Sequence, residues 1–311
     1  MGGVSRLVAG LSSKVGRRDV KLKGVFIPLT TPFGTDQEIS YKDLKKNMEA
    51  YEKIPFQGYV VAGSNGEAPY LTPEERVSLV KFVASNTNKI VIGGATCEST
   101  KSTCQLSNSM ANAGADGLLI MPPFYFKKRM TEEAIMSHYT TIADSCDLPL
   151  IIYNMPYTTG FDISTQTLVK LARHPNIRGV KDSDVRKCAG TVLDTKDLNF
   201  DVLIGSAGYL LPALINGCSG GINGLAGILG REICQLYELF KEGRFEEATQ
   251  LQMSLCRPDT LLLAEMGVPG LKAAMDMSGQ LVGGLCRRPV LPPTDLDKQR
   301  IKLCLQQSGF M

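Results

Sequence analysis

The chain of 311 residues contains only two histidines, His138 and His174, and no paired cysteine motif. Two histidines argue against a histidine-based catalytic triad and against a histidine-rich metal site. The nine cysteines are odd in number and irregularly spaced, and no Cys-x-x-Cys pair occurs. This pattern favours reduced thiols in a reducing compartment over a disulfide framework or a zinc site. The sequence therefore predicts no metal site.

Long hydrophobic runs and a strong charge excess are also missing. No apolar run approaches the roughly 18–20 residues that cross a bilayer. The net charge is only +3, and the basic residues form no stripe that would suit a phosphate backbone. We therefore expect neither a membrane nor a nucleic acid as a partner. The apolar content of 43% is enough for one barrel-sized domain or two smaller domains.

The first eighteen residues contain no acid, and the first acidic residue is Asp19. Four basic residues and several serines lie here, and apolar residues recur at helical spacing (Val4, Leu7, Val8, Leu11 and Val15). This composition is typical of a mitochondrial transit peptide, and a disordered basic tail is the alternative. We assign residues 1–22 to this segment and expect the protein in the mitochondrial matrix. If the segment is not a transit peptide, we expect it in the cytoplasm.

From residue 23 onward, short β-rich runs alternate with amphipathic helical stretches. The pattern predicts eight strands, at Val25–Leu29, Gly58–Ala62, Lys89–Gly93, Gly117–Met121, Leu148–Tyr153, Ile177–Lys181, Asp201–Gly205 and Gly220–Asn223. It predicts intervening helices that include Tyr41–Tyr51, Thr72–Ser85, Ser99–Ala113, Thr131–Cys146 and Ser164–Arg173. Eight strands in this alternation favour an α/β fold of the (β/α)₈ TIM-barrel type over residues 23–228.

An open doubly wound sheet is the alternative fold. It usually has fewer strands and a glycine-rich phosphate turn after the first one, where this chain has Leu29-Thr30-Thr31-Pro32-Phe33. After about Ile228 the strand pattern stops. Residues 229–311 are predicted to form a helical appendix, with helices at Arg231–Lys241, Arg244–Leu255, near Thr260–Asp276 and at Asp295–Gln307.

Two predicted strands end on side chains that suit carbonyl chemistry. One ends at Tyr153 and the next at Lys181. Successive barrel strands deliver their terminal side chains to one pocket, so an amine nucleophile would meet a phenol that transfers protons. A buried amine is more often uncharged, as a Schiff-base lysine requires. Taken singly, each residue has another interpretation, because a strand-end lysine often reaches solvent and a tyrosine is often only packed.

A third element follows the second predicted strand, in Gly63-Ser64-Asn65-Gly66-Glu67. The glycines favour a tight turn whose backbone N–H groups, together with the Ser64 hydroxyl, can hold a carboxylate. An ordinary polar turn is the alternative. The motif is not a P-loop, because no Gly-Lys-Ser/Thr follows it.

With these motifs the chain resembles the pyruvate-dependent class I aldolase family, which includes dihydrodipicolinate synthase and N-acetylneuraminate lyase. Four motifs carry the resemblance, which extends over nearly the whole chain from Gly24: Thr31-Pro32-Phe33, Gly63-Ser64-Asn65-Gly66-Glu67, Tyr153-Asn154-Met155-Pro156 and Gly179-Val180-Lys181-Asp182-Ser183. The resemblance implies a Schiff base between Lys181 and pyruvate, with Tyr153 as the proton shuttle aided by Ser64.

The same resemblance implies further site residues. Ser64 and Asn65 would hold the pyruvate carboxylate. Tyr125, in Pro123-Phe124-Tyr125, matches the family tyrosine that reaches across a subunit interface. The chain is therefore expected to be a homo-oligomer, a dimer of dimers by family likeness. Because the substrate is bound covalently on Lys181, the resemblance implies no cofactor and no metal.

Within the family the chain most resembles the mitochondrial 4-hydroxy-2-oxoglutarate aldolases. Motifs that continue this likeness are Cys97-Glu98-Ser99-Thr100, His174-Pro175-Asn176-Ile177, Gly205-Ser206-Ala207-Gly208 and Val268-Pro269-Gly270-Leu271-Lys272. The likeness implies cleavage of 4-hydroxy-2-oxoglutarate to pyruvate and glyoxylate, with Ser183 and Gly205 contacting the substrate. It places the chain in hydroxyproline catabolism.

The absence of two kinds of residue supports the likeness to the 4-hydroxy-2-oxoglutarate aldolases, and one segment departs from their pattern. Dihydrodipicolinate synthases carry an arginine just after the Tyr-Asn-x-Pro motif, where this chain has Tyr157-Thr158-Thr159. Sialic-acid lyases carry acids where this chain has Ser206-Ala207. The aldolases typically have two glycines after Lys-Asp-Ser, and this chain continues with Asp184-Val185-Arg186. The alternatives are another lyase or synthase of the family, a non-catalytic barrel, and a phosphate-binding barrel isomerase.

Overall fold

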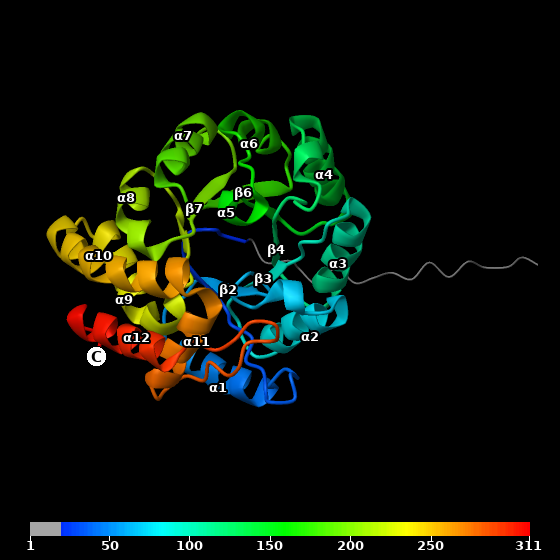
Figure 1. The fold of residues 1–311 in the computed structure, drawn as a ribbon. Coiled ribbons are helices and arrows are strands. Elements are labelled where there is room, and N and C mark those ends of the chain that lie inside the picture. Colours follow the sequence, from blue (N-terminus) through cyan, green and yellow to red (C-terminus); the bar gives the residue numbers. More distant parts are fainter. Residues whose placement is uncertain (1–19) are drawn as a thin grey trace, which may run out of the picture.

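Eight parallel strands close into a barrel in chain order, which confirms the predicted (β/α)₈ TIM-barrel fold (Figure 1). The computed structural model describes residues 20–311. Each strand pairs with its sequence neighbours, and the first pairs with the last through Gly24 and Gly220. The strands are β1 (Gly24–Pro28), β2 (Gly58–Val61), β3 (Ile90–Gly94), β4 (Gly117–Ile120), β5 (Leu150–Tyr153), β6 (Ile177–Asp182), β7 (Asp201–Ile204) and β8 (Gly220–Ile222).

A ring of helices surrounds the barrel and alternates with its strands (Figure 1). The longer ones begin on side-chain caps, such as the box of Thr72 and Glu75 that opens the second helix, because each cap satisfies backbone N–H groups that the helix leaves free. The helices are α1 (Tyr41–Tyr51), α2 (Pro73–Ala84), α3 (Thr100–Asn112), α4 (Glu132–Ser145), α5 (Pro156–Thr159), α6 (Thr165–Leu171), α7 (Val185–Thr195) and α8 (Leu210–Ile215).

Buried apolar side chains form two layers. The inner cluster fills the barrel with residues that alternate along the strands, among them Phe26, Val60 and Ile92. The outer cluster lies between strands and helices. Because side chains alternate between the two faces of a strand, most strands contribute to both layers. Tyr153 belongs to the inner cluster, so its side chain lies on the inner face at the end of β5.

The N-terminal end of the described chain is part of the inner cluster. Val20 and Leu22 are buried in it, and Leu22 lies close to Gly179 of β6. Of the predicted transit segment 1–22, residues 1–19 lie outside the described residues. Residues 20–22 therefore contribute to the packed barrel.

Helices alone follow the last strand: α9 (Ala226–Lys241), α10 (Phe245–Asp259), α11 (Gly267–Met277) and α12 (Asp295–Gln307). The helical stretch predicted near Thr260–Asp276 is divided, because a π-helical turn, Thr260–Glu265, precedes α11, and Gly267, the first residue of α11, has a positive φ of 63°. The helix α9 begins at Ala226, before residue 229, and its backbone is non-helical at Leu229. Among the described residues, no helix is both long enough and apolar enough to span a membrane.

Candidate active site

The amine at Lys181 and the phenol at Tyr153 lie side by side at the C-terminal end of the barrel. The two residues are direct partners in the register of β5 and β6, so their side chains leave the same face of adjacent strands. Lys181 is 7% exposed and Tyr153 is 6% exposed. The Lys181 Nζ atom lies 4.1 Å from the centroid of the Tyr153 ring. The structure thus brings together the two residues that sequence analysis assigned to Schiff-base chemistry.

A buried polar network fixes the ends of these two strands. The Asn154 amide donates to Asp182 Oδ2 at 2.7 Å and to Asp162 Oδ1 at 2.6 Å. Lys187 pairs with both carboxylates, 3.5 Å from Asp182 Oδ2. The backbone N–H of Asn154 donates to the Lys181 carbonyl at 2.9 Å. Because each buried polar group has partners, the backbone that carries Lys181 and Tyr153 has a defined position.

The turn after β2 offers two backbone donors. The N–H groups of Gly66, Glu67 and Ala68 bond to carbonyls within the turn. Those of Ser64 and Asn65 find no acceptor in the described part of the chain. The Asn65 side chain lies beside Gly224, because a Cβ atom on Gly224 would be 2.7 Å from its Nδ2 atom, and Nδ2 is buried with no hydrogen-bond partner among the described residues. The turn therefore presents backbone N–H groups and the Ser64 hydroxyl to an anion.

Ser183 and Gly205 adjoin the lysine. A Cβ atom on Gly205 would lie 3.3 Å from Lys181 Cε and 2.5 Å from Ser183 Oγ. The Gly205 N–H donates to the Asp182 carbonyl at 2.7 Å. Only glycine leaves both side chains in place here. The shortened segment after Ser183 starts α7 directly, with Asp184 as its N-cap.

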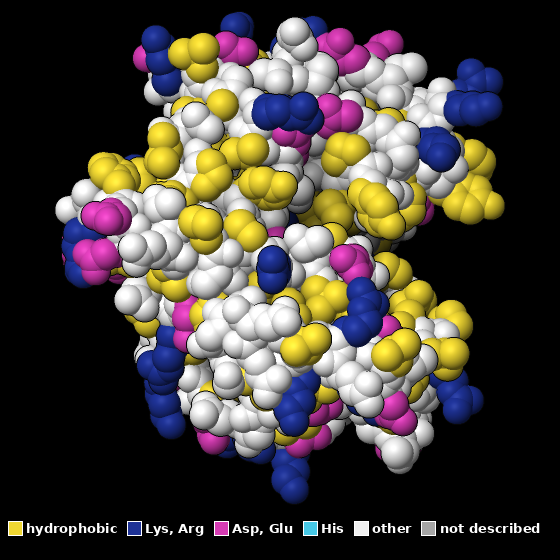
Figure 2. All heavy atoms as spheres, turned by 60° about the vertical axis from the view of Figure 1, so that its left-hand side comes forward, with side chains coloured by type: hydrophobic (Ala, Val, Ile, Leu, Met, Phe, Trp, Pro, Cys, Tyr) yellow, Lys and Arg dark blue, Asp and Glu magenta, His cyan; other side chains and the backbone are white. Residues whose placement is uncertain are grey.

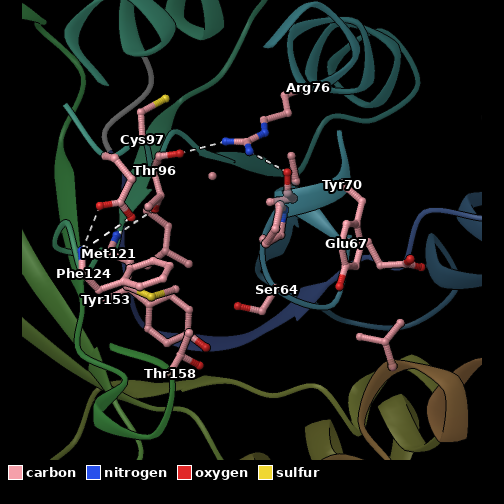
Figure 3. Close-up of a pocket in the computed structure, with 18 of the residues that line it drawn as sticks. Ser64, Glu67, Tyr70, Arg76, Thr96, Cys97, Met121, Phe124, Tyr153 and Thr158 are labelled. Carbon is pink, nitrogen blue, oxygen red and sulfur yellow. Dashed lines mark hydrogen bonds between the residues drawn. The ribbon is translucent and has the colours of Figure 1, made fainter. Parts of the chain in front are cut away.

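A cavity of about 520 Å³ opens beside these residues. In Figure 3, Ser64 and Tyr153 face each other across it, and Thr158 lies next to Tyr153. Val268, Pro269 and Val290 of the C-terminal region also line it. Lys181 is not one of the lining residues, and it adjoins the cavity through the Tyr153 ring that its amino group contacts. The cavity is large enough for a small oxo acid.

Tyr125 does not join this group within its own chain. It is 75% exposed and packs edge-on against Phe126, with ring centroids 5.0 Å apart. Its N–H donates to Glu98 Oε2 at 3.0 Å, and that of Phe124 donates to the same oxygen at 3.1 Å. Glu98 therefore holds the loop that presents Tyr125 outward.

Sequence reasoning missed several residues of the cavity wall. The Arg76 guanidinium donates to the carbonyls of Thr96 and Ala68 at 2.8 and 2.5 Å (Figure 3). Burial lowers the pKa of Arg76, and burial also raises the pKa of the neighbouring Cys97 thiol. The likeness noted at Cys97-Glu98-Ser99-Thr100 was the available signal, although it did not reveal that this segment borders the site.

The loop after β7 is tied to α10. The Ser206 hydroxyl donates to Asp259 Oδ2 at 2.5 Å, and Gln252 bonds to Ala207 and Leu211. Burial raises the pKa of Asp259, while the Ser206 hydrogen bond opposes this effect. The Ser206 hydroxyl is thus bonded to α10 and not to Lys181. Gly205 is the residue of this loop that adjoins Lys181.

Comparison with known proteins now identifies the family. The model of the dihydrodipicolinate synthetase family matches residues 21–308. The chain belongs to this family. Membership makes it a pyruvate-dependent aldolase or synthase. A 4-hydroxy-tetrahydrodipicolinate synthase from Haloarcula marismortui is 34% identical over 263 residues, covering 84% of this chain and 85% of the relative. A probable mitochondrial 4-hydroxy-2-oxoglutarate aldolase from Emericella nidulans is 32% identical over 297 residues, covering 92% and 94%.

Solved structures of the family superpose along nearly the whole chain. A dihydrodipicolinate synthase from Bacillus anthracis has a TM-score of 0.87 at 28% identity and covers 92% of this chain and 98% of its own. A prophage protein of the family from E. coli K12, solved in complex with pyruvate, has a TM-score of 0.89 at 25% identity and covers 94% and 100%. The barrel and its C-terminal helices are therefore shared with these relatives.

Proposed function

We propose that the protein is a class I aldolase that cleaves 4-hydroxy-2-oxoglutarate to pyruvate and glyoxylate. The observation that carries the proposal is the contact of the buried Lys181 amine with the Tyr153 ring, 4.1 Å away, beside a turn with two free backbone donors. A desolvated amine next to a phenol suits condensation with a ketone. The relative from Emericella nidulans that carries this activity in its name supports the choice.

We propose the following steps for these groups. The Lys181 amine attacks C2 of the substrate, and loss of water gives an iminium that withdraws electrons from C3. Tyr153, directly or through Ser64, takes the proton of the 4-hydroxyl group as the C3–C4 bond breaks. Glyoxylate leaves, the resulting enamine is protonated at C3, and water then releases pyruvate from the lysine. The N–H groups of the Ser64–Asn65 turn hold the C1 carboxylate throughout.

The choice of second product depends on the wall beside Tyr153. Thr158 lines the cavity there, in the segment where dihydrodipicolinate synthases carry the arginine for their second substrate. Most of the relatives compared are such synthases, so a synthase is the competing proposal. Thr158 brings no positive charge to this wall, which favours the aldolase.

Borohydride trapping tests the chemistry. With pyruvate present, reduction is expected to add one pyruvate-derived group to the intact mass, at Lys181, and Lys181→Ala is expected to show no adduct. An adduct on another lysine, or none in the parent, contradicts the proposal. Steady-state assays with 4-hydroxy-2-oxoglutarate, sialic acid and aspartate semialdehyde then test the substrate, and preference for either competitor would overturn our choice.

Location and assembly are part of the proposal. We propose import into the mitochondrial matrix, with cleavage before Val20, because Val20 and Leu22 are buried in the barrel. We also propose a homo-oligomer. Large apolar side chains are exposed on the side that carries α7, α8 and α10, namely Leu193, Tyr209, Ile215 and Met253, and Figure 2 shows hydrophobic side chains gathered across the upper half of this side. The oligomeric state differs among relatives, since one solved neighbour is a monomeric variant of dihydrodipicolinate synthase.

A further inference from the structure

A buried ion pair joins the C-terminal region to the turn that follows β2. Lys272, on α11, is 2% exposed, and Glu67, the last residue of the Gly63–Glu67 turn, is 3% exposed. The Lys272 Nζ atom lies 2.5 Å from Glu67 Oε1. The two residues are 205 positions apart in the chain. Neither takes part in the chemistry described above.

All three donors of the Lys272 amino group have acceptors. Besides Glu67, it donates to the Thr31 carbonyl and to the Leu285 carbonyl, both at 2.7 Å. The second Glu67 oxygen accepts the N–H of Arg287 at 2.8 Å. A fully bonded buried pair tolerates its loss of hydration, whereas removing one partner leaves an uncompensated charge.

The turn that the pair holds has an unfavourable backbone. Ala62, just before the turn, and Glu67, its last residue, have positive φ angles of 55° and 58°, a conformation that residues with a Cβ rarely adopt. Such a conformation persists only where surrounding contacts enforce it. Thr31 adds a second tie, since its hydroxyl donates to the Gly66 carbonyl at 2.8 Å while its own carbonyl accepts from Lys272.

We propose that Lys272 is a positioning residue for the substrate carboxylate, acting through Glu67 on the backbone N–H groups of Ser64 and Asn65. In Figure 3 the Glu67 side chain points away from Tyr153, so the pair acts from behind the turn. The C-terminal helices thereby control how well the barrel binds a 2-oxo acid. The inference rests on the proposed function and deepens it.

The test separates binding from chemistry. In Lys272→Met the half-saturating pyruvate concentration for borohydride trapping is expected to rise about tenfold, while the limiting trapping rate stays within about twofold, because Lys181 and Tyr153 keep their positions. In Glu67→Gln, which keeps the shape of the side chain, we expect a smaller rise. The double variant Lys272→Met/Glu67→Gln lacks the unpaired buried carboxylate, so it is expected to bind pyruvate better than Lys272→Met.

Lys302→Met is the matched control, since Lys302 is an exposed lysine on α12. If folded Lys272→Met reaches half-saturation at the same pyruvate concentration as the parent, the proposal is overturned. It is also overturned if only the limiting trapping rate of the variant falls. If Lys272→Met does not fold, Glu67→Gln decides, and parental half-saturation in that variant overturns it. A parent without any adduct contradicts the Schiff-base chemistry instead, and calorimetric binding of pyruvate to the same variants then still tests Lys272.

Discussion

Gly205 leaves room for two side chains of the proposed reaction, and its substitution is the most direct test at the scale of one residue. A methyl group there would lie 3.3 Å from Lys181 Cε and 2.5 Å from Ser183 Oγ. We expect Gly205→Ala to lower kcat/KM about 100-fold, because a displaced lysine no longer meets the carbonyl in a reactive geometry. Steady-state kinetics measure this loss.

Gly190 on α7 supplies the matched control. A methyl group on Gly190 would meet no atom within 4 Å, so Gly190→Ala is expected to keep parental kinetics. It should also raise the free energy of unfolding by about 0.5–1 kcal/mol through helix propensity. Equal activity of the two alanine variants would show that Gly205 does not shape the site.

Single residues were predictable where the rules of a parallel barrel apply to them. Lys181 and Tyr153 end apolar strands, and such ends converge, so the sequence placed both together. The importance of Glu67 was not predictable, because its partner Lys272 lies 205 residues away and nothing local indicates a buried pair. The sequence assigned Ser64 and Asn65 to the carboxylate without specifying which atoms of Asn65 would bind it. In the structure the Asn65 side chain lies beside Gly224, and its backbone N–H finds no acceptor among the described residues.

At the scale of elements, the packing of α3 against α4 depends on a neutral histidine. His138 is buried on α4 and its Nδ1 atom lies 2.9 Å from Thr100 Oγ1. Burial lowers the pKa of His138 from 6.5 to about 4. Between about pH 6.5 and pH 4, His138 is protonated in the unfolded chain but neutral in the folded chain. The free energy of unfolding therefore decreases as pH falls from about 6.5 to about 4. The loss amounts to about 3 kcal/mol at most.

His138→Asn removes this titration and keeps an acceptor for Thr100. We expect the free energy of unfolding of the variant to fall less than that of the parent between pH 7 and pH 4. Denaturant unfolding at a series of pH values measures the difference. If the free energies of unfolding of the parent and the variant differ by the same amount at every pH, the role of the buried ring is contradicted.

The strands and long helices follow from the sequence within a few residues, because alternation and caps are local signals. Three features did not follow from it. The helices α7 and α8 were not among the predicted helices, α5 is a single turn, and the segment at Thr260–Glu265 is π-helical. Each is set by what it packs against. The segment from Ser206 to Leu211, for example, is held by Asp259 and Gln252 of α10.

At the scale of the whole molecule, the N-terminal end of the described chain is part of the barrel core. A chain that starts at Val20 is expected to keep the parental stability of the barrel. A chain that starts at Lys23 loses the burial of Val20 and Leu22, which contributes about 4 kcal/mol in total, and its Tm should fall by about 10 °C. Equal Tm values for the two chains, measured by calorimetry, would contradict this account.

Assembly determines whether one chain can complete the proposed proton relay. Tyr125 is exposed and directed outward by Glu98, so within one chain it cannot assist Tyr153. If a second copy supplies it, Lys181→Ala and Tyr125→Ala should each be nearly inactive, yet a co-expressed mixture should recover activity. In a symmetric dimer, half of the assemblies formed at random are mixed, and each mixed dimer contains one complete site. The expected recovery is therefore about one quarter of the parental rate. If mixed assemblies are confirmed and the mixture is no more active than the mean of the separate variants, Tyr125 does not act across the interface.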